Sequence, residues 1–431
     1  MQGTPSPGMT ITAVPGRDYR LLWSAAVCSQ VGDSLRTPAL ALLAATLTRD
    51  PRAVAAVTVA GLLPPLLFGL LSGVYADRWD RRRTMAVVDG GRAVVVAALA
   101  WSVATGHAGI ATLVVVASLL ALLGTLFDAS AYALLPTVVP PERLAGANAR
   151  LQAGTAVAGG FVGAPLAGVL FAVSPALPFT ADALTFALAA VLILAIPAPA
   201  PRRSCTFRPG KDAQKGQSRG HNRKINENKG GVWEGIRFLR RDRVLWALTV
   251  GTAGSNLAIG GLASVLVLYA LAVLRVPEAA YGLFAAGAIA GGLGGALFAG
   301  RLAARFGTLP TLRVVLLGQT LALAGFALAR HPLTGGLAMA GFTAGSTIWN
   351  SLRAAYGQRH VPPDLLGRVG AAQRVAGLAA APAGAVLAGL AAQAFGLTPV
   401  PWAAAAVFAL VTAAVWVTFR ARTGPPAAPP H

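Results

Sequence analysis

The chain has 431 residues, of which 55% are hydrophobic and only 12% are charged, and its net charge is +21. Soluble domains carry roughly 25% charged residues, so this composition excludes an ordinary soluble protein and indicates a membrane protein. The basic residues lie between apolar runs of membrane length, which favours cytoplasmic loops over a nucleic-acid-binding surface. Cys28 and Cys205 do not predict a disulfide, and we expect no cofactor and no metal site.

Twelve apolar segments are long enough to span a membrane, which takes about 20 residues for a helix. Residues 1–16 lack the basic and apolar parts of a signal peptide, so we expect the first apolar segment to be retained. Gly and Pro alone separate several of the segments. The predicted spans are 20–46, 53–76, 84–104, 109–135, 146–172, 178–197, 244–273, 279–304, 312–329, 333–355, 368–393 and 400–419.

The basic residues are distributed unevenly between the predicted loops. If the loop around Asp77 lies inside the cell, nearly all of the 36 lysines and arginines fall in inner segments. This asymmetry predicts that both termini are cytoplasmic and that the number of spans is even. The exceptions are Arg49, Arg52, Arg275 and Arg330 in outer segments, and Arg36 and Arg92 within spans.

A polar segment divides the apolar chain near its middle. Residues 197–231 are rich in Gly, Lys, Arg and Asn, which predicts a flexible linker. Residues 231–243 alternate apolar and basic side chains, which predicts an amphipathic helix on the inner leaflet or, alternatively, a docking site for a partner. The predicted units are an N-terminal six-helix bundle (1–197), a cytoplasmic linker (198–243) and a C-terminal six-helix bundle (244–431).

The two bundles repeat one another in sequence. Phe127-Asp128 followed by Val139-Pro-Pro in the first half matches Trp349-Asn350 followed by Val361-Pro-Pro in the second. Two copies of six spans joined by a linker indicate a transporter built from parallel halves. The sequence therefore predicts an all-α membrane protein with 12 transmembrane helices in two six-helix bundles.

The loop after the second span carries Gly-x-x-x-Asp-Arg-x-x-Arg-Arg as Gly73, Asp77, Arg78, Arg81 and Arg82. With this motif the chain resembles the major facilitator superfamily over nearly its full length. The resemblance implies that Asp77 and Arg78 contact the start of span eleven and hold an inner gate shut. The alternative, which we expect for Arg83, is that these arginines only set the topology. The second half has nearly lost the motif, with Ala304 in the place of Asp77.

Span five carries a degraded exporter-type motif, Gly-x-x-x-Gly-Pro-x-x-Gly-Gly, as Gly160, Ala164, Pro165 and Gly168. With the start of span one, from Arg20 to Asp33, it resembles the branch that contains macrolide and enterobactin exporters. The same glycines are also typical of ordinary close packing between membrane helices.

Ionisable residues at membrane depth are costly unless they are paired or hydrated, so each is a functional candidate. Asp33 lies near the middle of span one, with Arg36 one turn later on the same face. We consider two roles for Asp33: a protonatable carboxylate that couples proton binding to substrate release, or a permanent partner of Arg36. Asp128 in span four either pairs with Arg78 or Arg81 as a latch or carries a proton.

The other acids within spans have simpler interpretations. Asp182 is expected in the first turn of span six, where a carboxylate favours the helix N-terminus. Asp89 and Arg92 are three residues apart and are expected to pair or to reach the interface. The resemblance places a central cavity between spans 1, 4, 7 and 10. The candidate cavity residues are Gln30, Asp33, Asp128, Asn256 and Asn350.

We expect a monomeric secondary transporter of the plasma membrane that exchanges protons for amphipathic small molecules, such as drugs or secondary metabolites, by alternating access. Its partners are then the substrate, protons and the lipid bilayer. The alternatives are an importer or uniporter, or the membrane subunit of an ATP-driven exporter, because the chain itself has no phosphate-binding loop. No enzyme is expected, since no catalytic spacing of Ser, His or Asp is present.

Overall fold

The computed structural model describes residues 16–78, 80–140, 144–197, 231–362 and 365–420. The first half forms six long helices, one of which is divided into three consecutive pieces. They are α1 (Arg17–Leu47), α2 (Pro51–Arg78), α3 (Arg81–Ala104), α4 (Ile110–Val138), α5 (Leu144–Val157) with η2 (Ala158–Gly163) and α6 (Ala164–Val173), and α7 (Leu177–Leu194).

The second half begins with a short helix and continues with six long ones. Each of the twelve predicted spans overlaps one long helix or, in span five, one continuous run of helical pieces. The helices are α9 (Gly231–Arg241), α10 (Arg243–Ala272), α11 (Glu278–Phe306), α12 (Thr308–Leu328), α13 (Pro332–His360), α14 (Leu366–Phe395) and α15 (Pro399–Arg420).

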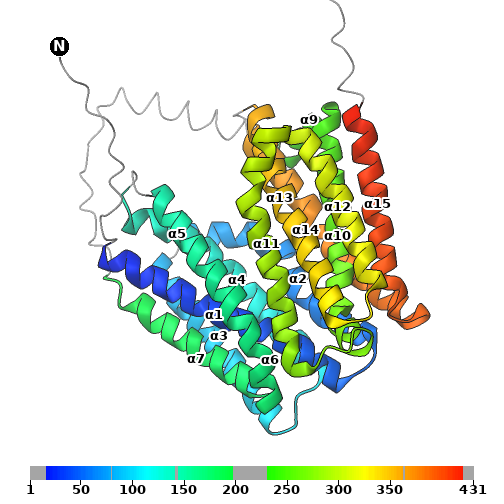
Figure 1. Ribbon diagram of the computed structural model, residues 1–431. Coiled ribbons are helices and arrows are strands. Elements are labelled where there is room, and N and C mark those ends of the chain that lie inside the picture. The colour runs from blue at the N-terminus through cyan, green and yellow to red at the C-terminus, as the bar shows by residue number, and fades with distance from the viewer. Residues whose placement is uncertain (1–15, 79, 141–143, 198–230, 363–364, 421–431) are drawn as a thin grey trace, which may run out of the picture.

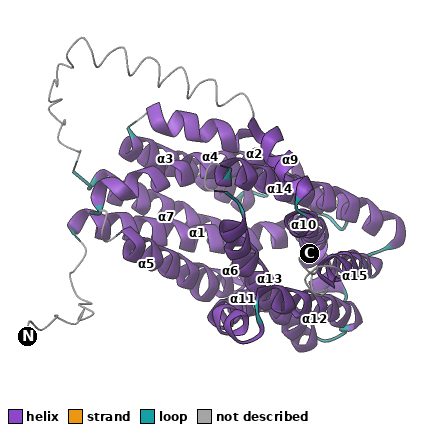
Figure 2. Cartoon of the chain, turned by 90° about the horizontal axis from the view of Figure 1, so that it is seen from above, coloured by secondary structure: helices purple, strands orange, loops and turns teal. Residues whose placement is uncertain are grey.

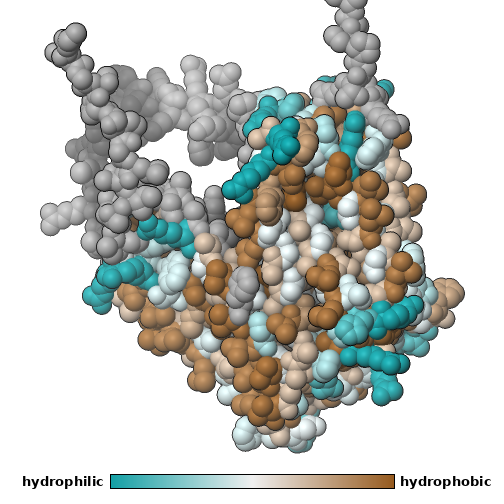
Figure 3. All heavy atoms as spheres, viewed as in Figure 1, coloured by the Kyte–Doolittle hydropathy of each residue, from teal (hydrophilic) through white to brown (hydrophobic). Residues whose placement is uncertain are grey.

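The prediction of an all-α membrane protein is confirmed. Ten helical segments in the described ranges are long and apolar enough to cross a membrane. The other two long helices, α1 with 31 residues and α13 with 29, are long enough but contain more polar side chains. Figure 3 shows hydrophobic side chains over much of the second half in that view, with hydrophilic ones gathered near its two ends.

The fifth span is widened by a π-helical turn over Ala158–Gly163. Within this turn the N–H of Ala164 donates to the carbonyl of Gly159, five residues earlier, rather than to the residue four earlier. Pro165 follows directly and has no N–H to continue an ordinary helical ladder. Such single π-helical turns are frequent at functional sites. The span-five motif therefore lies at a local break in helix geometry.

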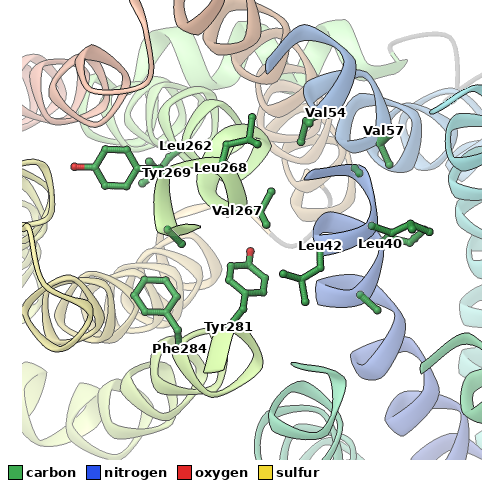
Figure 4. Packing of buried hydrophobic residues seen from close by; sticks show 14 of the residues in the cluster. Leu40, Leu42, Val54, Val57, Leu262, Val267, Leu268, Tyr269, Tyr281 and Phe284 are labelled. Carbon is green, nitrogen blue, oxygen red and sulfur yellow. The ribbon is translucent and has the colours of Figure 1, made fainter. Parts of the chain in front are cut away.

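The two halves meet at one end of the molecule and diverge toward the end where the described chain begins and finishes (Figure 1). Two helix pairs join them, α2 with α14 and α6 with α11 (Figure 2). A buried apolar cluster closes this end between the halves. In Figure 4, Tyr281 of α11 lies next to Val267 of α10 and Leu42 of α1.

Glycines bring these helix pairs into backbone contact. A Cβ atom built on Gly168 of α6 would lie 3.0 Å from the backbone nitrogen of Gly282 in α11. A Cβ on Gly282 would lie 3.0 Å from the nitrogen of Gly168. On the other pair, a Cβ on Gly389 of α14 would lie 2.7 Å from the Cβ of Ala55 in α2. Small residues thus permit the close packing on which helix association in membranes depends.

The helix expected after the linker is present as α9, and it packs on the second half. Leu239 is buried against a cluster that includes Leu245 of α10 and Val369 of α14. The guanidinium of Arg240 lies 5.5 Å from the ring centroid of Trp246. The predicted position on the inner leaflet and the predicted docking of a partner both stay predictions.

Gly282→Val should push α11 away from α6 and open the closed end, because its Cβ would meet backbone atoms that cannot swing aside. We expect spin labels at Arg49→Cys and Arg275→Cys, in a background without Cys28 and Cys205, to shift several ångströms apart. The measurement is a pulsed electron–electron resonance distance distribution. Gly287→Val is the matched control on α11, because a Cβ there meets nothing within 4 Å. Unchanged distances in Gly282→Val would contradict the assignment of this contact.

Candidate functional site

A cavity of about 750 Å³ lies between the two halves, next to the closed end. The first half contributes residues from α1, α2, α3, α4, η2 and α6, among them every charged residue of the wall. The second half contributes residues from α10 and α11, among them Ser264, Val267 and Tyr281. The charged wall residues are Asp33, Arg36, Arg92 and Asp128.

Arg36 of α1 holds two carboxylates. It forms an ion pair and a hydrogen bond with Asp33, one turn earlier on the same helix. Its Nε atom also lies 3.1 Å from Oδ2 of Asp182 in α7. Asp182 is fully buried, so this contact supplies the positive charge that an ionised carboxylate needs at such a depth.

Arg92 of α3 forms the second centre of the network. Its Nη1 atom lies 3.5 Å from Oδ1 of Asp89, which is fully buried, and 3.8 Å from Oδ2 of Asp33. The guanidinium also lies 5.3 Å from the ring centroid of Phe127 and 5.0 Å from that of Phe186. Aromatic faces attract a cation, so these rings further stabilise the buried guanidinium.

Two glycines make room for the network. A Cβ on Gly32 of α1 would collide with Asp182 and Thr185 of α7, and a Cβ on Gly124 of α4 would lie 2.6 Å from Nη2 of Arg92. Any larger residue at either position would displace a charged group. The two glycines therefore allow the polar groups of α7 and α3 to approach their neighbouring helices.

The network, defined as Asp33, Arg36, Asp89, Arg92 and Asp182, contains three carboxylates and two guanidiniums. Each arginine contacts one fully buried acid, and Asp33 contacts both arginines. The side chain of Asp33 is 28% exposed, whereas those of Asp89 and Asp182 are 0% exposed. Asp33 is thus the carboxylate that is shared, and it is the one that faces the cavity.

Asp128 and Gln30 also lie on the cavity wall. Asp128 is exposed to the cavity and makes no ion pair or hydrogen bond within the described ranges. Gln30 donates a 3.3 Å hydrogen bond to Ser34 on the next turn of α1. A carboxylate without a partner at this depth is available to a proton or to a cationic ligand.

Asn256 and Asn350 lie away from this cavity. Asn256 of α10 donates a 3.1 Å hydrogen bond to the carbonyl of Gly377 in α14. Asn350 of α13 is exposed and does not belong to the described cavity wall. Of the expected helices, α1, α4 and α10 line the described wall and α13 does not, while α2, α3, η2, α6 and α11 also contribute. The role of the two asparagines in substrate binding stays a prediction.

The predicted inner-gate loop is described only in part. The backbones of Gly73, Asp77 and Arg78 belong to the last turns of α2, but their side chains lie outside the described residues. Asp80 caps α3, where its carboxylate accepts a 2.9 Å hydrogen bond from the N–H of Arg83. Arg82 donates to the carbonyl of Leu194 in α7 at 3.0 Å, and Arg81 begins α3. The predicted gating contact stays a prediction.

The span-five motif lies where the first half touches the second. A Cβ on Gly160 would meet the side chain of Ile289 in α11, and a Cβ on Gly282 of α11 would meet the carbonyl of Ala164. Gly168 faces Gly282, as described above, and Pro165 lies in the first turn of α6, the ordinary helix after the π turn. These residues are brought together at an interface between helices, and their role in export stays a prediction.

The contact between Asp182 and Arg36 is not predicted from the sequence. Asp182 is the sixth residue of α7, so it lies in the second helical turn rather than in the first, and its partner is on another helix. One signal was present in the sequence: the first half carries more acids than arginines within its spans. Counting these charges indicates that some acids must share an arginine, but it does not say which.

Arg92→Leu should lower the free energy of unfolding by about 3–5 kcal/mol, because it leaves fully buried Asp89 without its cation. The measurement is the thermal unfolding of the purified protein in detergent. Arg52→Leu is the matched control, since its partner Asp50 and Arg52 itself are exposed at 37% and 54%. It should cost about 0–1 kcal/mol. Equal losses in both variants would refute a structural role for the buried pair.

Comparison with known proteins agrees with this architecture. The family model of the Major Facilitator Superfamily matches residues 22–382. Uncharacterised MFS-type transporters of Mycobacterium bovis and Mycobacterium tuberculosis are 34% identical over 150 residues, a match that covers only 34% of this chain and 34% of each relative.

Solved structures share the fold at low sequence identity. A bacterial homologue of the human lysosomal transporter Spinster, inward-facing and unoccupied, gives a TM-score of 0.74 at 15% identity, covering 96% of this chain and 100% of the other. An inward-facing bacterial homologue of the iron transporter ferroportin gives a TM-score of 0.73 at 15% identity, covering 93% of this chain and 98% of the other. A variant of the nucleoside transporter NupG gives a TM-score of 0.72 at 11% identity, covering 94% of this chain and 100% of the other. The chain belongs to the major facilitator superfamily.

Proposed function

We propose that this transporter exports amphipathic small molecules in exchange for protons and that Asp33 is the group that carries the proton. The observation that supports the proposal is the charge count of the buried network. If all three of its carboxylates were ionised, the two arginines would leave one negative charge uncompensated at membrane depth. Such a charge costs several kcal/mol unless it is neutralised or hydrated.

A proton on Asp33 removes this excess without breaking the other pairs. Arg36 would keep Asp182, and Arg92 would keep Asp89, so each arginine would still face one ionised acid. Asp33 is also the network carboxylate that lines the cavity, so it can exchange a proton with water there. Loss of that proton would return a negative charge to the cavity wall, and Asp128 would add a second one.

The cavity wall favours an amphipathic substrate. Its charged groups are concentrated on α1, α3 and α4, while Val267, Ala285 and Ile289 present apolar surface from the opposite half. A molecule with one polar and one apolar side fits such a wall, since apolar burial supplies affinity and a few polar groups fix its orientation. The span-five motif supports export as the direction of transport.

The arrangement of the halves supports alternating access, which we propose for a monomer in the plasma membrane. They diverge at the end near residues 17 and 420, which the distribution of basic residues predicts to be cytoplasmic (Figure 1). The conformation is therefore inward-facing if that orientation holds. Closing the inner end would then bring the start of α14 toward the end of α2, where Gly73, Asp77 and Arg78 lie.

Asp33→Asn should abolish proton-driven uptake of amphipathic dyes into everted membrane vesicles, because the amide cannot take up the proton. Binding of the same dyes to purified protein should persist. Uptake is measured by fluorescence, and the proton flux is measured by dissipation of an imposed pH gradient. A full proton response in Asp33→Asn would rule out Asp33 as the coupling group.

Asp50→Asn is the matched control, because hydrogen bonding from the backbone of Arg52 lowers the pKa of Asp50 and keeps it ionised in an exposed loop. It should transport like the unchanged protein.

Uptake by right-side-out vesicles alone would instead identify an importer, and transport that survives collapse of the gradient would identify a uniporter or an ATP-driven system.

Asp77→Ala should lower transport at least severalfold at normal expression, if Asp77 and Arg78 hold the inner gate shut by contacting the start of α14. Arg83→Ala should transport normally. In the described part of the chain, Arg83 contributes to the start of α3 through its backbone N–H, which donates to the carboxylate of Asp80, and alanine keeps this N–H. Both rates are measured in the vesicle assay above. Normal transport in Asp77→Ala would leave the loop with the topological role alone.

A further inference from the structure

A second groove runs along the first half, between α1 and the continuous helix formed by α5 and η2. Its volume is about 770 Å³, and none of its wall residues belongs to the cavity described above. One side presents Trp23, Val27 and Val31 of α1, and the other presents Ala153, Val157 and Val162. Val157 and Val162 are 53% and 42% exposed, so the groove is open on one side.

Between its two arginines and the π-helical turn, the wall of the groove is mostly apolar. Trp23, Val27 and Val31 follow one another at one-turn spacing along α1. Between Val157 and Val162 the spacing is five residues rather than four, and the π-helical turn keeps both on the groove. From Arg20 to Val31 a helix rises about 16 Å. That is roughly half of the 30 Å hydrocarbon core, the depth of a single leaflet.

Two arginines stand at one end of this groove. Arg20 of α1 and Arg150 of α5 are both exposed wall residues, and neither forms an ion pair within the described part of the chain. The helices are joined there by hydrogen bonds from Tyr19 to the carbonyl of Ala147, at 2.9 Å, and from Trp23 to that of Arg150, at 3.1 Å. Hydrogen bonds therefore hold the two helices together at this end of the groove, and the end is positively charged.

The three longest segments for which the structure gives no description do not match the groove in sequence. Residues 1–15 and 421–431 contain no acidic residue, so they offer nothing to the arginines. Residues 198–230 contain two acids among many basic and polar residues, so they lack an apolar stretch to follow the groove. The complementary ligand is an anion joined to a single apolar chain about one leaflet long.

We propose that the groove binds an anionic phospholipid of the inner leaflet, with one acyl chain between α1 and α5–η2 and the phosphate between Arg20 and Arg150. The end with the arginines is the predicted cytoplasmic end, where basic residues attract anionic lipids. The groove ends beside the π turn, whose Gly160 faces Ile289 of α11. A bound lipid therefore contacts the helix that connects the two halves. This proposal does not depend on the substrate or on proton coupling.

The test is lipid retention by the full-length protein, measured by native mass spectrometry after reconstitution in mixed phosphatidylcholine and phosphatidylglycerol and extraction into detergent. We expect the unchanged protein to retain phosphatidylglycerol over phosphatidylcholine. The variant Arg20→Ala/Arg150→Ala should reduce that preference about tenfold, because each arginine near the membrane surface contributes to anionic-lipid affinity.

Two further variants separate the parts of the proposal. Arg301→Ala/Arg305→Ala removes two exposed arginines of α11 toward the same end and should leave the preference unchanged. Val157→Trp fills the groove, keeps both arginines and should lose the retained lipid at unaltered thermal stability. An unchanged preference in Arg20→Ala/Arg150→Ala, or an equal loss in the α11 control, would overturn the site. Retention by Val157→Trp equal to that of the unchanged protein would overturn the placement of the acyl chain.

Discussion

The cost of placing charge inside a membrane shapes the first half of this transporter. Arg92 is buried and Arg36 is partly buried between helices, and each contacts a fully buried carboxylate from another turn or another helix. Their common partner, Asp33, joins the two pairs into one network across α1, α3 and α7. Removing either arginine leaves a fully buried carboxylate without its cation, so the packing of these helices and the electrostatics of the cavity are a single constraint.

Small residues make room for the charged network between the helices. Gly32 and Gly124 leave space for Asp182 and Arg92, and no larger residue would allow the same contacts. The second half uses small residues differently. There Gly260 and Gly384 bring the backbones of α10 and α14 together, and the polar contacts are neutral, as between Asn256 and Gly377. One half thus carries charge at membrane depth, and the other supplies rigid apolar packing.

The sequence predicts the helices well because a spanning helix depends on local composition and length, which the bilayer fixes. Contacts within one helix, such as those of Asp33 with Arg36 and of Asp89 with Arg92, follow from spacing in the same way. The contact between Arg36 and Asp182 does not, because it joins residues far apart in the chain and depends on how α1 and α7 pack. The π turn is equally hidden, since Gly and Pro there are compatible with an ordinary kink.

The ion pairs of the described chain all lie within the first half. The halves touch instead through apolar side chains and through glycine contacts, such as Gly168 with Gly282 and Gly389 with Ala55. Contacts of this kind depend on van der Waals packing and on the close approach of small residues. Movement between the halves therefore need not break a buried ion pair. In the proposed mechanism, the charge state of Asp33 would bias which conformation is favoured, while the network stays within the first half.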